Sequence, residues 1–511
     1  MQRTENPAKK KGLKKWLKKY HKWVSLILSL FILLFSLSGI VLNHRKTFSG
    51  TDVSRNFLPS KYHFNNWNLA AIKGSLHISG DSTLIFGNIG IYLTNNHFDE
   101  LADFNQGLPK GTDFRKISSL ALDLDGNLFA ASYFGLYERK VTDSLWRKLE
   151  LPTETERIVK VLTMGDSVLV MNRSELFLKY PKVSEFRKIE LPAPADYLPK
   201  TGLFRTLWMI HSGEIYGLFG KLLVDALALI CIFLTLSGLI YVIAPSLIKR
   251  VSIKWKENIR RVNRFTLKWH NLLGVWSVGF LIVTSVTGIF LRPPFLIAIA
   301  NAKISPIPFS VLDCENPWND KLRDIVYDGT ENGFMISTSE GMYFGHLEDA
   351  LLYPFTYQPS VSVMGINVLK KVKDGEYLIG SFSGMFRWFP ASGQVLDYFT
   401  AQPYKANRGG SPIGKNTISG YIEKQDGTPI IFDYGLGALS PQQNAIKSMR
   451  DSGLDKLPIS LWNLALEVHT GRIWEFALGS FYILIVPLTG LSMLFILITG
   501  LWLWIHKRRK S

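Results

Sequence analysis

Residues 19–43, KYHKWVSLILSLFILLFSLSGIVLN, begin with a basic and aromatic cluster around His21 and continue as an uncharged apolar run. Residues 268–291, KWHNLLGVWSVGFLIVTSVTGIFL, follow the same order, with His270 near the start and Thr287-Gly288 where the first stretch has Ser38-Gly39. A helix of about 20 apolar residues spans the hydrocarbon core of a bilayer. Both stretches therefore predict membrane-spanning helices, and their likeness predicts an internal duplication.

Four apolar runs of the chain are long enough to span a membrane: Val24–Asn43, Leu222–Ile248, Asn271–Leu291 and Phe476–Ile505. The first run is too long for a signal peptide and no small-residue cleavage site follows it, so we expect a retained anchor. The fourth run has about 30 residues and contains Pro487. We expect it to tilt, to kink or to project beyond the bilayer.

The basic residues gather beside the apolar runs. The chain of 511 residues has 59 Lys and Arg against 41 Asp and Glu, a formal net charge of +18. Residues 1–22, 246–269 and 506–511 hold nine, eight and four basic residues against one, one and no acidic residue, which leaves the rest of the chain nearly neutral. This distribution is the positive-inside pattern of a membrane protein and argues against nucleic-acid binding.

The charge pattern predicts a multi-pass protein of a bacterial inner membrane, with both termini in the cytoplasm and two large periplasmic loops. The fold class is then a membrane helical bundle with extracytoplasmic β structure. The expected segments are a basic cytoplasmic N-terminus (1–22), TM1 (23–44), a first external β-rich loop (45–205), TM2 (206–248), a basic cytoplasmic loop (249–268), TM3 (269–292), a second external β-rich loop (293–465), TM4 (466–505) and a basic cytoplasmic tail (506–511).

The second and fourth spans also begin alike. Residues 210–216, IHSGEIY, precede the second span, and residues 468–474, VHTGRIW, precede the fourth. Four coincidences in the same order predict a four-helix bundle built from two copies of a two-helix unit. We expect the copies to be related by a pseudo-two-fold axis along the membrane normal.

Each large loop contains three strand pairs of a common form, in which two apolar residues and a small polar turn precede a second, mostly glycine-led strand. The pairs begin at Ile85, Leu128 and Leu169 in the first loop and at Phe334, Leu378 and Ile430 in the second. Spacings of about 40–50 residues are typical of propeller blades. The phrase Tyr377–Trp388 resembles propeller repeats of two-component sensors. Three blades per loop predict one six-bladed propeller made by both loops, and two separate small β domains are the alternative.

Four histidines at the membrane edges are the candidate ligands. His21 and His270 lie at equivalent cytoplasmic ends of the first and third spans, and His211 and His469 at equivalent external ends of the second and fourth. Ionisable residues at membrane depth favour a functional interpretation. Two imidazoles that converge across a bundle are what a six-coordinate b-type haem requires. The alternative is that these residues only anchor helix ends at the interface.

Other residues near the spans have weaker functional signals. His44 is a substitute external ligand or an interfacial cap, and Arg472 either pairs with a haem propionate or lies at the interface. Asp225 forms an i,i+4 ion pair with Lys221 or contacts a proton or a propionate. His506 is interpreted as a cytoplasmic anchor, and His63, His77, His97 and His346 as turn or surface residues. Seven glycines would let a flat macrocycle or a helix approach closely: Gly39, Gly220, Gly238, Gly274, Gly279, Gly288 and Gly479.

The two cysteines, Cys231 and Cys314, indicate no disulfide framework. The chain has no CxxCH motif, so a haem would be held without thioether links. The chain also lacks a GxGxxG fingerprint, an HExxH helix and a GxSxG elbow, which disfavours dinucleotide chemistry and hydrolysis.

The spans resemble the PepSY-associated transmembrane family, which includes bacterial iron-regulated membrane proteins and ferric-siderophore reductases. The motifs that carry the resemblance are His21-Lys22-Trp23 with Leu37–Ile40, Trp269–Gly274 with Thr287-Gly288, and the pair His211-Ser212-Gly213 and His469-Thr470-Gly471. The resemblance implies one or two b-type haems with His21, His211, His270 and His469 as ligands. The external loops depart from the family pattern, since propeller-like repeats stand where the family often has PepSY modules.

The sequence thus predicts an electron-transfer protein that reduces an external acceptor. The resemblance implies that this acceptor is a ferric chelate or siderophore. Its enzymatic activity would be that of a haem-dependent ferric-chelate reductase. An external electron donor, a quinol or a membrane reductase, is then required. The competing hypothesis is a membrane-anchored propeller that binds or senses an external ligand or protein without catalysis. Transport through the bundle is disfavoured because Asp225 alone interrupts the apolar cores.

Overall fold

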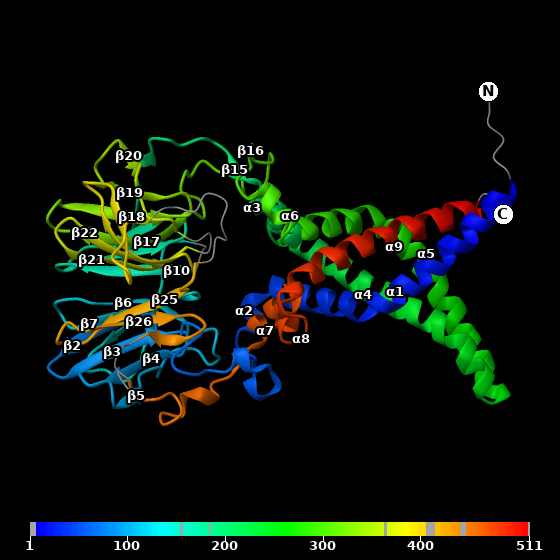
Figure 1. Ribbon diagram of the computed structural model, residues 1–511, viewed down its shortest axis with the longest axis horizontal. Helices are drawn as coiled ribbons and strands as arrows, with labels where there is room; N and C mark the ends of the chain where they lie inside the picture. The colour runs from blue at the N-terminus through cyan, green and yellow to red at the C-terminus, as the bar shows by residue number, and fades with distance from the viewer. Residues whose placement is uncertain are drawn as a thin grey trace. The chain divides into compact units, whose positions relative to one another are not determined.

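The computed structural model describes residues 7–153, 157–181, 183, 185–361, 365–404, 414–439 and 446–508 (Figure 1). The chain divides into two compact units. A helical unit comprises Met1–Arg45, Pro199–Asp313 and Trp462–Ser511, and a β unit comprises Lys46–Leu198 and Cys314–Leu461. Both units therefore draw on both halves of the sequence.

Four long helices form the helical unit: α1 (Pro7–Asn43), α4 (Gly217–Arg250), α5 (Ile253–Phe290) and α9 (Ile485–Arg508). Among the described residues, four helical segments are long and apolar enough to cross a membrane. They contain three of the predicted spans and all but the last residue, Leu291, of the third span in the chain. Helices α1 and α5 each contact both α4 and α9. The predicted four-helix bundle is thus present.

Each repeat enters its second long helix through a short helix that ends near a histidine. These entry segments are α3 (Leu203–Ser212) with η3 (Glu214–Tyr216), and α7 (Leu461–His469) with η5 (Arg472–Trp474). The glycine that follows adopts a left-handed conformation in both copies, with φ of 80° at Gly213 and 75° at Gly471. A side chain on Gly213 would also strike the backbone of Gly220. The HSG and HTG motifs therefore encode a sharp turn.

The fourth apolar run is not one kinked helix. It is divided into α8 (Glu475–Leu478), η6 (Gly479–Leu484) and α9. Pro487 lies in the first turn of α9, where its missing N–H removes no intrahelical hydrogen bond. The proline thus accompanies the start of a helix instead of bending the middle of one.

The centre of the bundle is an apolar cluster to which all four long helices contribute. Its buried members are Ile32, Leu227, Cys231, Leu281 and Leu497. Along α1, Ile32 lies between His21 and Ser38, and along α5, Leu281 lies between His270 and Thr287. Apolar side chains therefore fill the middle of the bundle and separate its two ends.

The β unit contains six antiparallel sheets of three or four consecutive strands in its described residues. The first three sheets are β2 (Gly74–Ser79), β3 (Ser82–Gly87), β4 (Gly90–Thr94) and β5 (Leu101–Asp103); β6 (Ile117–Leu122), β7 (Asn127–Ser132), β8 (Gly135–Lys140) and β9 (Arg147–Leu149); and β10 (Ile158–Met164), β11 (Ser167–Asn172), β12 (Leu176–Lys179) and β13 (Arg187–Ile189). The next three are β17 (Leu322–Asp328), β18 (Gly333–Thr338), β19 (Met342–Gly345) and β20 (Leu351–Pro354); β21 (Ile366–Lys373), β22 (Glu376–Ser381), β23 (Gly384–Phe389) and β24 (Gln394–Asp397); and β25 (Ile418–Glu423), β26 (Pro429–Asp433) and β27 (Gly437–Leu439).

Each strand pair predicted from the sequence forms a hairpin of one sheet. It is the central hairpin in the first five sheets and the hairpin of β26 with β27 in the sixth. In the first sheet, for example, β3 pairs with β4 so that Ile85 faces Tyr92 and Phe86 faces Ile91. Short elements tie the halves of each unit together. They are β14 (Ala193–Pro194), parallel to β20, and the pairs of β1 (Asp52–Val53) with β28 (Ile459–Ser460) and β15 (Thr201–Gly202) with β16 (Lys303–Ile304).

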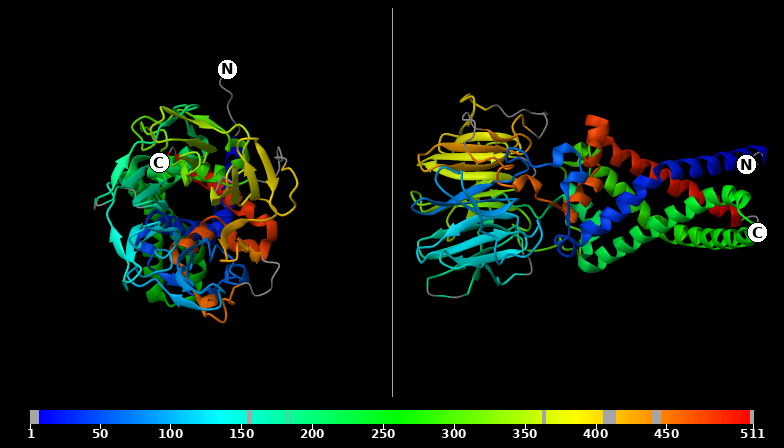
Figure 2. Two further views of the ribbon diagram at one scale, coloured as in Figure 1. Left: turned by 90° about the vertical axis from the view of Figure 1, so that its left-hand side faces the viewer. Right: turned by 90° about the horizontal axis from the view of Figure 1, so that it is seen from below.

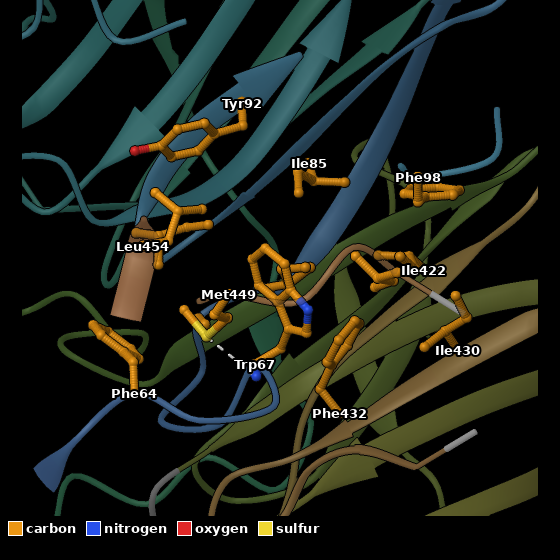
Figure 3. Close-up of a cluster of buried hydrophobic side chains, with 14 residues drawn as sticks. Phe64, Trp67, Ile85, Tyr92, Phe98, Ile422, Ile430, Phe432, Met449 and Leu454 are labelled. Atoms are coloured by element: carbon orange, nitrogen blue, oxygen red, sulfur yellow. Dashed lines mark hydrogen bonds between the residues drawn. The ribbon is translucent and has the colours of Figure 1, made fainter. Parts of the chain in front are cut away.

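The first strand of each sheet contacts the first strand of the next, in the order β2, β6, β10, β17, β21 and β25, and β25 contacts β2 again. Figure 2 (left) shows the sheets following one another around a ring. The first and sixth sheets share a core in which Trp67, Ile85 and Phe98 pack with Ile422, Ile430 and Phe432 (Figure 3). Residues from the two large loops are thus buried against one another.

Candidate functional site

The four candidate histidines lie at two levels of the helical bundle. His21 and Ser38 are 17 residues apart on α1, and His270 and Thr287 are 17 residues apart on α5. At a rise of 1.5 Å per residue, the two levels are separated by about 26 Å along these helices. His21 and His270 occupy the level nearer the basic segments, and His211 and His469 occupy the other.

The rings of His211 and His469 face each other, with centroids 6.0 Å apart and planes inclined by 57°. Metal–nitrogen bonds of about 2 Å on either side of one ion place two imidazole centroids about 6 Å apart. The separation therefore suits two ligands of one metal. His21 and His270 are close enough for electrostatic interaction when ionised, so they lie in the same neighbourhood of the other level.

The hydrogen-bond network assigns the tautomer of three of these rings. Nδ1 lies 3.1 Å from the carbonyl oxygen of Ile496 in His21, 2.9 Å from that of Thr284 in His211, and 3.1 Å from that of Phe35 in His469. A carbonyl only accepts hydrogen bonds, so Nδ1 carries the hydrogen in each ring. In the neutral imidazole, Nε2 then keeps its lone pair.

His270 reaches the same state through a hydroxyl. Its Nδ1 lies 2.8 Å from Oγ of Ser237, and that hydroxyl donates its own hydrogen to the carbonyl of Leu234. Within the described chain, the structure gives Nε2 of the four rings no hydrogen-bond partner. Metal-bound histidines have this arrangement, with one ring nitrogen held by a carbonyl or hydroxyl and the other left for the metal.

The surroundings of the His211–His469 pair are apolar and aromatic, with two polar donors that have no partner. The ring of Phe35 meets His469 edge-on, and Phe31 packs between Phe35 and Trp474. Nε of Arg292 and Nε1 of Trp474 are buried and have no hydrogen-bond partner among the described residues. Paired neutral imidazoles, an apolar surround and unsatisfied donors for a carboxylate fit a b-type haem with its propionates.

Arg292 is a site candidate that the sequence reasoning missed. Arg292 lies within electrostatic range of Arg472, Glu467 and His469. Arg292 follows Gly288 by four residues, as Asn43 follows Gly39, so it occupies the position of Asn43 in the second repeat. A comparison of the repeats beyond their shared glycines is the signal that would have found it.

The remaining candidates have partners within the bundle. His44 Nε2 contacts Asp225 Oδ2 at 2.7 Å, and Asn43 Nδ2 donates to Asp225 Oδ1 at 2.9 Å. Lys221 pairs with Glu214 at 2.8 Å, so the ion pair between Lys221 and Asp225, one of the two expectations for this carboxylate, is wrong. Asn43, the last residue of α1, and His44, which follows it, contact Asp225 instead.

Two further sequence candidates have local contacts. Arg472 forms a salt bridge with Glu467 beside the His211–His469 level. His506 stacks on Trp502 with ring centroids 3.8 Å apart, and its Nδ1 lies 2.9 Å from the Trp502 carbonyl oxygen. Neither contact involves one of the four paired histidines. His506 lies near the end of α9, the position expected of an anchor.

A second cluster of titratable groups lies in the β unit. Burial of the Asp328 carboxyl opposes ionisation, but hydrogen bonds from Lys371 and Tyr377 outweigh it and lower the pKa of Asp328 to about 2. Burial and the same carboxylate raise the pKa of Tyr377. These groups join the fourth and fifth sheets, and each has a protein partner, which indicates a structural role.

Among the described residues, no group of three or more His, Cys, Asp or Glu side chains is placed to hold a metal ion by itself.

One family model matches the chain twice in succession, over residues 3–243 and 240–507. The model describes the PepSY-associated TM region. The chain belongs to the PepSY-associated TM region family. Together the two matches cover nearly the whole of this family member, and their boundary near residue 240 agrees with the internal duplication. No curated protein matches its sequence.

Solved structures with some likeness to this family member are distant. A protein described as a hybrid two-component system of B. thetaiotaomicron matches through its extracellular domain at 10% identity, with 72% of this chain and 32% of that chain covered and a TM-score of 0.36. YCF48 from Cyanidioschyzon merolae matches at 9% identity, with 77% and 87% covered and a TM-score of 0.33. The chain spans about a third of the length of the first. Likenesses this low assign neither activity nor ligand to it.

Proposed function

We propose that this PepSY-associated TM protein binds b-type haem at both levels of its bundle and passes electrons across the membrane to an external acceptor. His211 and His469 would hold one haem, and His21 and His270 the other. Haem, when bound, supplies one-electron oxidation and reduction. The observation that carries the proposal is that all four rings have Nδ1 engaged by a neighbouring helix, which leaves Nε2 for a metal.

The chain between the two levels favours electrons over ions as cargo. The cluster of Ile32, Leu227, Cys231, Leu281 and Leu497 closes the bundle with apolar side chains. An ion would lose its hydration there at a cost of several kcal/mol, whereas an electron needs no polar path.

The orientation follows from the basic segments. We place the His21–His270 level on the cytoplasmic side of a bacterial inner membrane by the positive-inside pattern, with the β unit outside. We further propose that the six sheets are the blades of one closed propeller, supported by the contact between β25 and β2 and by the core shared by Trp67 and Phe432. The acceptor would be a ferric chelate or siderophore, reduced with electrons from a quinol or a membrane reductase.

The direct test is the visible spectrum of the protein purified in detergent from haem-replete cells. We expect a b-type α-band after dithionite reduction and two haems per chain by pyridine-haem quantitation. A reduced sample should reoxidise on addition of a ferric chelate. A colourless protein would contradict the proposal and leave a membrane-anchored β unit as a binding module.

Single substitutions assign the ligands. His469→Ala and His21→Ala should each remove about one haem per chain, because each ring is one of only two protein ligands at its level. His506→Ala is the matched control, since its ring contacts only Trp502 of its own helix in the described structure. Full haem content in both ligand variants would contradict the assignment of these histidines as haem ligands.

A further inference from the structure

Each of the four histidines packs against a Ser-Gly or Thr-Gly dipeptide on a neighbouring helix. His469 meets Ser38-Gly39, His270 meets Ser237-Gly238, His211 meets Thr287-Gly288, and His21 meets Thr499-Gly500. The hydroxyl oxygens lie 3.0, 2.8, 3.3 and 3.0 Å from the respective Nδ1 atoms. The same dipeptide contact thus occurs four times in one bundle.

The hydroxyl of each dipeptide can only accept from the imidazole. Each donates its single hydrogen to a backbone carbonyl of its own helix: Ser38 to Leu34, Ser237 to Leu234, Thr287 to Val283 and Thr499 to Phe495. The lone pairs that remain face Nδ1–H. A hydroxyl so arranged supports the tautomer that leaves Nε2 free, and it orients the plane of the ring.

The glycine of each dipeptide makes room for the ring. A Cβ added to Gly288 would lie 2.9 Å from Cε1 of His211, and one added to Gly500 would lie 3.1 Å from Cε1 of His21. The corresponding distances are 3.4 Å for Gly39 with His469 and 3.9 Å for Gly238 with His270. At Gly288 and Gly500, a larger residue would push the imidazole away from its helix.

Every one of these contacts joins the two repeats. His21 and His211 belong to the first repeat and pack on α9 and α5 of the second, and His270 and His469 of the second pack on α4 and α1 of the first. The position of a ring therefore depends on the register between repeats.

We propose that the four Ser/Thr-Gly dipeptides are positioning residues for the histidine ligands, with the hydroxyl holding Nδ1–H and the glycine setting the depth of the ring. This inference rests on the proposed haem function. A hydrogen bond at Nδ1 makes the imidazole a stronger donor to a metal and favours the oxidised state. The dipeptides thus contribute to the reduction potential as well as to geometry.

The hydroxyl is tested with Thr287→Val and Thr287→Ser. The valine variant keeps the shape of the side chain and loses the hydroxyl acceptor, while the Thr284 carbonyl 2.9 Å from Nδ1 remains. We therefore expect two haems per chain and a higher midpoint potential for one of them. A tenfold change in its reduction equilibrium corresponds to about 59 mV. The serine variant restores the acceptor and should return the potential to the wild-type value, which a purely structural role would not predict.

The glycine is tested with Gly288→Ala, with Gly279→Ala as the matched control. Both lie in α5, and nothing lies within 4 Å of a Cβ at Gly279. Alanine favours a helix over glycine, so loss of helix stability cannot explain an effect. We expect Gly288→Ala to alter the low-spin electron paramagnetic resonance signal of one haem or to lower haem content, and Gly279→Ala to match wild type.

The outcomes separate the inference from the proposed function. Wild-type protein without haem overturns the proposed function and this inference with it. Wild-type protein with two haems, together with unchanged potentials and spectra in Thr287→Val and Gly288→Ala, overturns the inference alone. A potential shift in Thr287→Val that serine reverses, with a spectral change at Gly288→Ala alone, supports it.

Discussion

The two repeats of the bundle agree where they hold histidines and differ four residues beyond the shared glycines. After Gly39 the first repeat continues to Asn43-His44, which contact the carboxylate of Asp225. After Gly288 the second continues to Arg292, whose buried Nε has no hydrogen-bond partner in the part of the chain that the structure describes. The histidines and their dipeptides are common to both copies. The copies differ in that the first has the carboxylate of Asp225 here and the second has the guanidinium of Arg292.

The β unit also differs between its two repeats at a polar position. The junction of the first two sheets is an apolar cluster that includes Leu84, Leu120 and Leu128. The equivalent junction in the second repeat, between the fourth and fifth sheets, adds the ion pair of Asp328 with Lys371, 2.6 Å apart. The hydroxyl of Tyr377 is a second donor to this buried carboxylate and helps to offset the cost of its burial.

The largest effect is expected from Asp225→Ala. The substitution leaves the donors of Asn43 and His44 without their acceptor, so we expect the free energy of unfolding to fall by about 3 kcal/mol. This value is at the low end for a broken buried pair because His44 is partly exposed. Thermal unfolding followed by circular dichroism in detergent measures it. Lys221→Ala breaks the more exposed ion pair of Lys221 with Glu214. It should lower the free energy of unfolding by about 1 kcal/mol or less.

The haem content of Asp225→Ala distinguishes a purely structural role of this carboxylate from a role in haem binding. We expect Asp225→Ala to keep two haems per chain. Loss of a haem with unchanged thermal stability would move this carboxylate into the haem site and erase the distinction between the copies.

A pH-dependent effect of about 2 kcal/mol is expected from Asp328→Asn. The pKa of Asp328 is lowered in the folded protein from about 3.8 to about 2, so its ionised form stabilises the fold above pH 4, and this contribution is lost as the pH falls towards 2. The difference in unfolding temperature between wild type and Asp328→Asn should therefore be full at pH 5 and shrink between pH 4 and pH 2. A difference that does not change over this range would disprove an ionic origin.

The smallest effect is expected from Arg292→Gln. A guanidinium that pairs with a propionate slows haem release, and its loss should raise the rate of haem transfer to apomyoglobin about tenfold, equivalent to about 1.4 kcal/mol. Arg264→Gln is the control, since Arg264 is exposed near the other end of α5 and pairs with Glu257. Equal rates in wild type and Arg292→Gln would assign the unsatisfied donor to something other than a haem.

The sequence predicted the parts of this fold that depend on local pattern. Apolar length identified the four spans. Paired apolar residues followed by a small polar turn and a glycine-led strand identified the central hairpins around Ile85 and Leu378. The duplication was evident because His21, His270, His211 and His469 recur in matching contexts. The interrupted start of α9 was not predicted, since hydropathy does not distinguish a 3₁₀ turn from an α-helix.

By itself, the sequence determined that this is a four-span member of the PepSY-associated TM region family with paired histidines, because length, charge and repetition are properties of neighbouring residues. Only the tertiary structure decided which atoms meet. The contact of His469 with Ser38, that of His44 with Asp225 and the packing of Trp67 on Phe432 join residues more than 180 positions apart. Such contacts depend on the register between helices and between sheets, and packing across the whole molecule sets that register.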